Sequence, residues 1–162
     1  MIGTLRLANI DEADVLVALI NAAYEKEAFF KIGDRTDAAE VTDRLENGCF
    51  LVADEAGDVV GCVYIAIHGE RGYFGMLSVH PSRQGTALGR ALIGAAEEHC
   101  RMAGCAEMEL EVVNLREELI PWYGRLGYVQ FATAPFPQPE RASRDCHMLL
   151  MKKALSVEGS GT

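Results

Sequence analysis

The sequence predicts an α/β domain built on a mixed, twisted sheet of about seven strands with four helices, an arrangement that some schemes class as α+β. Runs of alternating apolar and polar residues, typical of strands, recur between stretches with helical periodicity. In the middle of the chain, three successive strand-like runs separated by turn residues predict an antiparallel meander. A strand, a helix and a strand follow, which predicts a right-handed parallel crossover.

The composition is that of an ordinary globular domain. The 162 residues fit one domain, predicted over residues 1–155, with a disordered tail over 156–162. No apolar run is long enough to span a membrane and charged residues come too early for a signal peptide, so we expect a cytoplasmic protein without a membrane partner. The net charge of −9 also opposes binding to nucleic acid. Five scattered cysteines lack zinc-site spacing, so we expect reduced thiols and no metal.

The N-terminal part of the chain predicts a strand followed by two helices. Residues 4–10 alternate with period two, and Asp11 is placed to cap a helix whose apolar residues share one face. A second, shorter helix is predicted to begin after Asp37, which has capping-box spacing to Glu40, and to end at Gly48.

The middle of the chain predicts the meander and the crossover helix. Three strand-like runs within residues 49–79 are separated by the turn sequences GD and GERG. A helix is expected over about residues 85–102, and the chain returns as a strand over 105–113. In that strand the residues between the apolar positions are glutamates: Glu107, Glu109 and Glu111.

The C-terminal part predicts one helix and two strands. Asn114 and Glu117 have the spacing of a helix cap, but Pro121 would break the helix interior, so we expect a kink or a restart there. Strands are expected over residues 126–133 and 146–155, joined by a loop whose prolines resist both helix and sheet.

The stretch LSVHPSRQGTALGRALI forms a glycine-containing turn from a strand into the crossover helix. The free N–H groups and the dipole of a helix N-terminus attract phosphate. Gly85 and Gly89 allow close approach of a ligand, Ala87 is nearly as small, and Arg83 and Arg90 add positive charge. The spacing matches neither a P-loop nor G-x-G-x-x-G, so a diphosphate that is not being hydrolysed is the expected ligand. A turn without a ligand remains the alternative.

Two motifs in this region resemble those of the GNAT acyltransferase superfamily. The run VHPSRQGTALGRAL is similar to its acetyl-CoA-binding motif Q/R-x-x-G-x-G/A, with Gln84, Ala87 and Gly89 at the motif positions and Ala87 in place of the usual glycine. The run LEVVNLREELIPWYGRLGYV resembles the later family motif, with Asn114 and Tyr123 two residues further apart than is common. The order of the predicted elements is similar over nearly the whole chain.

The resemblance implies how acetyl-CoA, as a co-substrate, would bind. The sheet of this superfamily is splayed between the fourth and fifth strands, and the pantetheine arm lies in the gap. Main-chain groups of residues 77–79 would hold the arm, and one N–H would polarise the thioester carbonyl. The implied coenzyme contacts are Leu77, Ser78, Val79, Arg83, Gln84, Gly85, Thr86, Ala87, Leu88, Gly89, Arg90, Asn114 and Tyr123.

Acyl transfer to an amine needs a base that keeps the amine neutral and an acid that assists the departing thiolate. The resemblance gives Tyr123 the role of the acid, and a core tyrosine is the alternative. Glu111 is the candidate base, because repulsion among neighbouring glutamates and partial burial raise a carboxylate pKa. A solvated strand face, or a chain of water molecules acting as the base, would explain the same residues.

The acceptor amine is expected to enter opposite the coenzyme, between residues 29–36 and the proline-rich loop before Asp145. Phe29 and Phe30 would form an apolar wall. Further candidates for substrate contacts are Arg35 and His147, with Lys31, Arg141 and Arg144 as cations for a carboxylate or phosphate. Ordinary surface charge explains these cations equally well.

The resemblance therefore implies an acetyl-CoA-dependent N-acetyltransferase that acts on a primary amine of a small molecule or peptide by direct transfer in a ternary complex. The acidic net charge favours a cationic amine, and a homodimer is compatible with the sequence. One alternative is a non-catalytic acyl-CoA-binding sensor or interaction module, which would fit Ala87 and the lack of an obvious base. Another is an α/β domain without affinity for the coenzyme.

Overall fold

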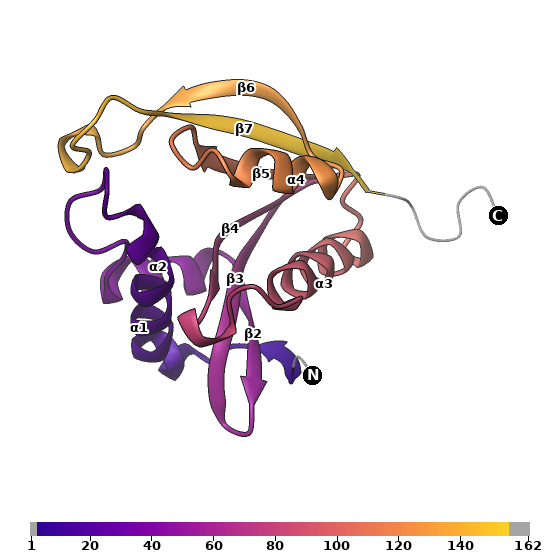
Figure 1. Cartoon of the computed structure of the whole chain (residues 1–162). Helices are drawn as coiled ribbons and strands as arrows, with labels where there is room; N and C mark the ends of the chain where they lie inside the picture. Colours follow the sequence, from indigo (N-terminus) through magenta and orange to yellow (C-terminus); the bar gives the residue numbers. More distant parts are fainter. Residues whose placement is uncertain (1–2, 156–162) are drawn as a thin grey trace.

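Seven strands form one mixed sheet in the order β1-β2-β3-β4-β5-β7-β6, and helices cover both of its faces (Figure 1). This computed structural model describes residues 3–155, so the tail predicted over 156–162 lies outside the described residues. The strands are β1 (Thr4–Leu7), β2 (Cys49–Glu55), β3 (Asp58–His68), β4 (Arg71–Val79), β5 (Glu107–Val113), β6 (Val129–Pro135) and β7 (His147–Ala154). The α-helices are α1 (Ala13–Ala23), α2 (Ala38–Asn47), α3 (Leu88–Met102) and α4 (Leu119–Arg125).

Alternating side chains of the central strands supply two cores, one on each face of the sheet. On β2, Phe50 and Val52 pack on the face covered by α1 and α2, whereas Leu51 and Ala53 pack on the face covered by α3 and α4. This division follows from the period of two in a strand, and it is the alternation that the sequence shows. No helix within residues 3–155 combines the length and the apolar character needed to cross a membrane.

The parallel strands β4 and β5 are paired only at their start. Arg71–Tyr73 pair with Glu107–Glu109, and the two strands then diverge. A bulge in β4 marks the divergence: Met76 has a φ of 52°, and the register against β3 shifts there. A left-handed conformation is costly for a residue with a Cβ, so the surrounding packing must hold it. The predicted fold class, with seven strands, four helices and a splay between the fourth and fifth strands, is confirmed.

The first two helices begin at caps of different kinds. The Asn9 N–H donates to the Glu12 carboxylate at 2.8 Å in a 3₁₀ turn that precedes α1, so the prediction of Asp11 as the cap was wrong. At α2 the Asp37 cap is confirmed, because its carboxylate accepts the Glu40 N–H at 2.9 Å. The other half of the capping box does not form, since the Glu40 carboxylate accepts the Thr36 hydroxyl at 2.6 Å instead.

The start of α3 lies three residues later than predicted. The helix begins at Leu88 instead of Gly85, because the Thr86 hydroxyl accepts the Leu88 N–H at 3.3 Å and donates to the Arg83 carbonyl at 2.6 Å. Thr86 thus closes the turn and leaves Gly85 outside the helix, with a φ of 81°.

The helix α4 is continuous, contrary to the predicted break. It begins at Leu119, so Pro121 lies in its first turn, where a backbone N–H has no partner within the helix. Asn114 does not cap this helix. Its side-chain oxygen instead accepts the His147 N–H at 2.9 Å, which joins the end of β5 to the start of β7.

Candidate active site

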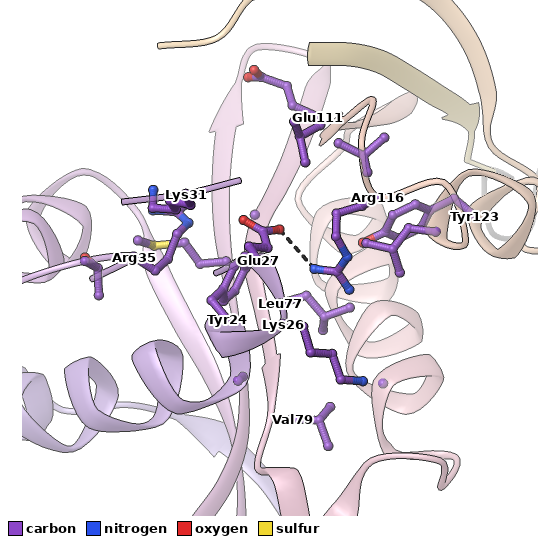
Figure 2. Close-up of a pocket in the computed structure, with 18 of the residues that line it drawn as sticks. Tyr24, Lys26, Glu27, Lys31, Arg35, Leu77, Val79, Glu111, Arg116 and Tyr123 are labelled. Atoms are coloured by element: carbon purple, nitrogen blue, oxygen red, sulfur yellow. Dashed lines mark hydrogen bonds and ion pairs between the residues drawn. The ribbon is translucent and has the colours of Figure 1, made fainter. Parts of the chain in front are cut away.

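A cavity of about 760 Å³ occupies the space that the splay opens between β4 and β5. It is lined by β4 beyond its bulge, by the turn that follows β4, by the end of β5, by α4 and by the segment after α1. We call its two regions the turn end, lined by residues 83–86, and the far end, lined by Lys31, Arg35 and Arg141. Figure 2 shows side chains that line the cavity, including Lys31 and Arg35 of the far end.

The turn end presents free main-chain donors. The N–H groups of Gly85, Thr86 and Ala87 make no hydrogen bond to any other described residue. They precede the first turn of α3, whose dipole adds partial positive charge. A Cβ added to Gly85 would meet no atom within 4 Å, so this peptide is open to a ligand. Such donors suit a phosphate or diphosphate.

The two side chains that begin this turn already have protein partners. The Arg83 guanidinium binds the Glu55 carboxylate at 2.6 and 3.0 Å, and the Gln84 amide donates to the Val79 carbonyl at 3.2 Å. Arg83 therefore brings less free charge to an anion than the sequence suggested.

The edge of β4 offers further main-chain groups inside the cavity. The His80 N–H binds the Val60 carbonyl on β3 at 2.8 Å, so the alternation of an antiparallel ladder directs the polar groups of Val79 away from β3. That direction is toward the gap where β5 has diverged. Leu77 lies in the bulge and also lines the cavity. Ser78 faces the other way, and its buried hydroxyl donates to the Met76 carbonyl at 2.9 Å.

The cavity brings together some of the residues singled out in the sequence and leaves others outside. Leu88 and Phe30 are fully buried in the packing, and Asn114 is engaged with β7. Those that line the cavity are Leu77, Val79, Arg83, Gln84, Gly85, Thr86, Gly89, Arg35, Glu111 and Tyr123. Those that do not line it are Ser78, Ala87, Leu88, Arg90, Asn114, Phe29, Phe30 and His147.

Tyr123 projects from α4 into the middle of the cavity (Figure 2). Its ring is held by Trp122, Phe74 and Tyr128, with ring centroids 5.1, 6.1 and 6.3 Å away. Its hydroxyl makes no hydrogen bond to another described residue, and burial raises its pKa. A phenol of this kind is protonated at neutral pH and is available as a proton donor.

A buried glutamate that the sequence analysis missed lies opposite Tyr123. Glu27 follows α1 and is only 8% exposed, and its carboxylate accepts a hydrogen bond from Arg116 at 3.0 Å (Figure 2). Burial raises the Glu27 pKa more than the Arg116 charge lowers it. A local signal was present: Glu27 continues the helical stripe of Leu16 and Ile20, where an apolar residue is expected.

The glutamates of β5 are more accessible. Glu111 lines the cavity but is exposed, and in Figure 2 its carboxylate points away from Glu27 and Tyr123. Glu109 lies 3.5 Å from Arg71. The partial burial expected for Glu111 is therefore found at Glu27 instead.

The two segments between which the acceptor was expected to enter are joined to each other. The Ile32 N–H donates to the Arg141 carbonyl at 2.7 Å, and the Ser143 N–H donates to the Phe30 carbonyl at 2.7 Å. These hydrogen bonds join the two backbones beside the far end of the cavity, which side chains from both segments line. Among residues 3–155, no three His, Cys, Asp or Glu side chains are grouped to hold a metal ion.

The arrangement combines an anion site, an exposed strand edge, a protonated phenol and a carboxylate with a raised pKa in one cavity. One family description agrees with it: the model for the "Acetyltransferase (GNAT) family" matches residues 14–128.

Several solved structures with similar folds are described as acetyltransferases. The ribosomal-protein-S18-alanine N-acetyltransferase from Escherichia coli is 15% identical, with a TM-score of 0.80 over 98% of this chain and 97% of that chain. Ard1 from Thermoplasma volcanium is 19% identical, with a TM-score of 0.77 over 96% and 99% of the two chains. A putative acetyltransferase from Salmonella typhimurium, yncA, solved with acetyl-CoA, is 21% identical, with a TM-score of 0.71 over 98% and 97%. At these identities the likeness shows a common fold.

Proposed function

Because this chain belongs to the acetyltransferase (GNAT) family, we propose that it transfers an acetyl group from acetyl-CoA to a primary amine of a small molecule or peptide. The transfer is direct, within a ternary complex, and takes place in the cytoplasm. The proposal rests on one observation above all: the splay of β4 and β5 joins free main-chain donors at the turn end to Tyr123 and Glu27 in one cavity.

The described residues fit acetyl-CoA as the co-substrate. The N–H groups of Gly85 and Thr86 would bind its diphosphate, and the β4 edge at Leu77 and Val79 would hold its pantetheine arm. The Salmonella relative was solved with this coenzyme, which supports the assignment. A main-chain N–H of β4 would polarise the thioester carbonyl, since free donors stabilise charge that develops on an oxygen.

Two carboxylates of the cavity are candidates for the base that takes the proton from the amine. We assign this role to Glu27, because a base near neutral pH needs a raised pKa and burial provides one. The Glu27 oxygen that does not bind Arg116 makes no hydrogen bond to a described residue, so it is free to accept a proton. Glu111, the base expected from the sequence, is the alternative.

Tyr123 is the proposed acid. As the C–S bond breaks, the sulfur gains charge, and the Tyr123 hydroxyl would donate a hydrogen bond or a proton to it. The aromatic packing of the ring fixes the direction of the hydroxyl. The raised pKa keeps the hydroxyl protonated, so that it stabilises the thiolate by donating a hydrogen bond.

The test is a measurement of thiol release from acetyl-CoA in the presence of amines, amino acids and short peptides, with coenzyme binding followed separately by thermal shift. We expect stabilisation by acetyl-CoA and thiol release that depends on an amine. Binding without turnover for every amine would support a non-catalytic sensor instead. The absence of a thermal shift would contradict both.

A further inference from the structure

The far end of the cavity is positively charged although the chain as a whole carries a net charge of −9. Lys31, Arg35 and Arg141 all line it. The first two follow α1, and the third belongs to the loop before β7, so segments more than a hundred residues apart place cations at one site. In Figure 2, Lys31 and Arg35 lie on the opposite side of Glu27 from Tyr123.

These three cations are poorly matched by carboxylates. Within the described part of the chain, neither Lys31 nor Arg141 forms an ion pair. Arg35 lies 3.7 Å from Glu40, but the same carboxylate also lies 3.8 Å from Arg44. Glu40 therefore faces two guanidiniums. Glu27 also attracts Lys31 and Arg35, but its carboxylate is already paired with Arg116, so the far end keeps an excess of positive charge.

The cations are held in place although they repel one another. Lys31 and Ala142 are bridged as strand partners, and the Lys31 ammonium lies 5.9 Å from the centroid of the Phe136 ring. The Arg35 guanidinium lies 5.1 Å from the centroid of the Tyr24 ring. Burial, followed by the charge of Arg35, lowers the Lys31 pKa. A bound anion would relieve this repulsion.

We propose that the acceptor is an amine that also carries a carboxylate, as an amino acid does, with the carboxylate bound by Lys31, Arg35 and Arg141. The proposal rests on the proposed function, because the amine is then directed toward Glu27 and Tyr123 while the carboxylate occupies the far end. Two of the cations are guanidiniums, whose planar donors match a carboxylate. The acidic composition of the whole chain favours a cationic amine. The positive charge of this site favours instead an amine that also carries a negative group.

The first experiment measures binding of the reaction product, which does not depend on turnover. N-acetyl amino acids and their uncharged amides are titrated into the protein in the presence of coenzyme A. We expect the carboxylate form to bind at least about tenfold more tightly, which is the effect of one hydrogen bond between charged groups. Equal affinities would overturn the proposal. So would a higher affinity for the analogue in which a phosphonate replaces the carboxylate than for the carboxylate itself.

Matched variants locate the effect. Lys31→Gln and Arg141→Gln should each reduce the ratio of the two affinities toward one. Arg144→Gln is the control, because it removes the same charge from the same region, yet Arg144 stacks on Phe29 at 5.3 Å and does not line the cavity. An equal effect of all three variants would show a general effect of charge and would overturn the assignment. So would a higher KM for acetyl-CoA as the main effect of Lys31→Gln or Arg141→Gln, since the cations would then bind the coenzyme.

The same panel separates this inference from the proposed function. Selective binding of carboxylate products without turnover of any amine would contradict the enzyme and retain the anion site. Turnover of amino acids and of their amides with equal kcat/KM, and equal product affinities, would retain the enzyme and contradict the anion site.

Discussion

Two arginine–glutamate pairs in this protein have similar contact distances and opposite effects on the carboxylate. At the edge of the sheet, Arg6 binds Glu12 through two hydrogen bonds of 2.8 and 2.9 Å, and the pKa of Glu12 is lowered to about 2. In the cavity, Arg116 binds Glu27 at 3.0 Å, yet the pKa of Glu27 is raised. An ion pair alone therefore does not determine which protonation state a carboxylate prefers.

The difference lies in hydration and in the number of hydrogen bonds. Hydrogen bonds from Arg6 and from the Asn9 backbone outweigh the modest desolvation of Glu12. The Glu27 carboxylate accepts one hydrogen bond, and the side chains of Glu27 and Arg116 are each only 11% exposed. Desolvation is therefore the largest effect on the Glu27 pKa. The same chemical pair thus gives a permanently charged link at the sheet edge and a carboxylate that can accept a proton in the cavity.

The strongest test of this contrast is the pair of variants Glu27→Gln and Glu12→Gln. Glutamine keeps the size of the side chain and cannot act as a base, so Glu27→Gln should lower kcat/KM about a hundredfold, the lower range for loss of a general base. Glu12→Gln should leave the rate unchanged. Initial rates of thiol release at saturating acetyl-CoA check both.

Glu111→Gln completes that test because Glu111 lines the same cavity but is exposed. We expect a smaller loss than for Glu27→Gln. A larger loss in Glu111→Gln would transfer the role of base to β5 and would show that burial does not identify the catalytic carboxylate here.

The next effect in size is that of Tyr123→Phe. The ring would keep its packing against Phe74 and Trp122, but the proton donor would be lost. We expect kcat to fall roughly tenfold, which corresponds to one hydrogen bond to a charged group, with the KM for acetyl-CoA unchanged. Steady-state kinetics with varied acetyl-CoA separates the two quantities, and an unchanged kcat would exclude Tyr123 as the acid.

The pH dependence of the reaction should reflect the raised pKa of Glu27. A base acts only when deprotonated, so kcat/KM should fall roughly tenfold for each pH unit below that pKa, which lies above the ordinary value of 4.5. In Glu27→Gln this acidic limb should disappear, whereas it should persist in Glu12→Gln. An acidic limb of the same position in all three proteins would assign it to another group.

Most of the fold could be predicted because its signals are local. The alternation of β2 and the turn residues of the meander depend on neighbours in the sequence, and they predicted the antiparallel strands. The splay between β4 and β5 was implied by the resemblance to the family. The details that failed depend on distant partners. Asn114 was expected to cap a helix, but its oxygen accepts the His147 N–H, 33 residues away.

The site could be predicted only in part for the same reason. Tyr123 and the turn end follow from sequence motifs, and the cavity contains both. The pairing of Glu27 with Arg116 joins residues 89 positions apart. The one local signal was a charged residue at a position where the apolar face of α1, continued beyond its end, predicts an apolar side chain. The excess of positive charge at the far end likewise depends on two loops that hydrogen bonds join, and no local pattern shows that.

The smallest expected effect is on stability, and it should differ in sign between the two pairs. Because the folded pKa of Glu12 is lowered, its stabilisation is present above the unfolded value near 4.5 and is lost as the pH falls toward about 2. The pair is partly exposed, so Glu12→Gln should lower the free energy of unfolding by about 1 kcal/mol at pH 7 and by less near pH 3.

Glu27 has a raised folded pKa, so its contribution to stability is fully present below the unfolded pKa and is lost as the pH rises through the folded pKa. Urea unfolding between pH 3 and 8 measures both effects. As the pH rises, the free energy of unfolding of the wild type should increase relative to that of Glu12→Gln and decrease relative to that of Glu27→Gln. If the free energies of the two variants changed with pH in parallel, the contrast between the pairs would be contradicted.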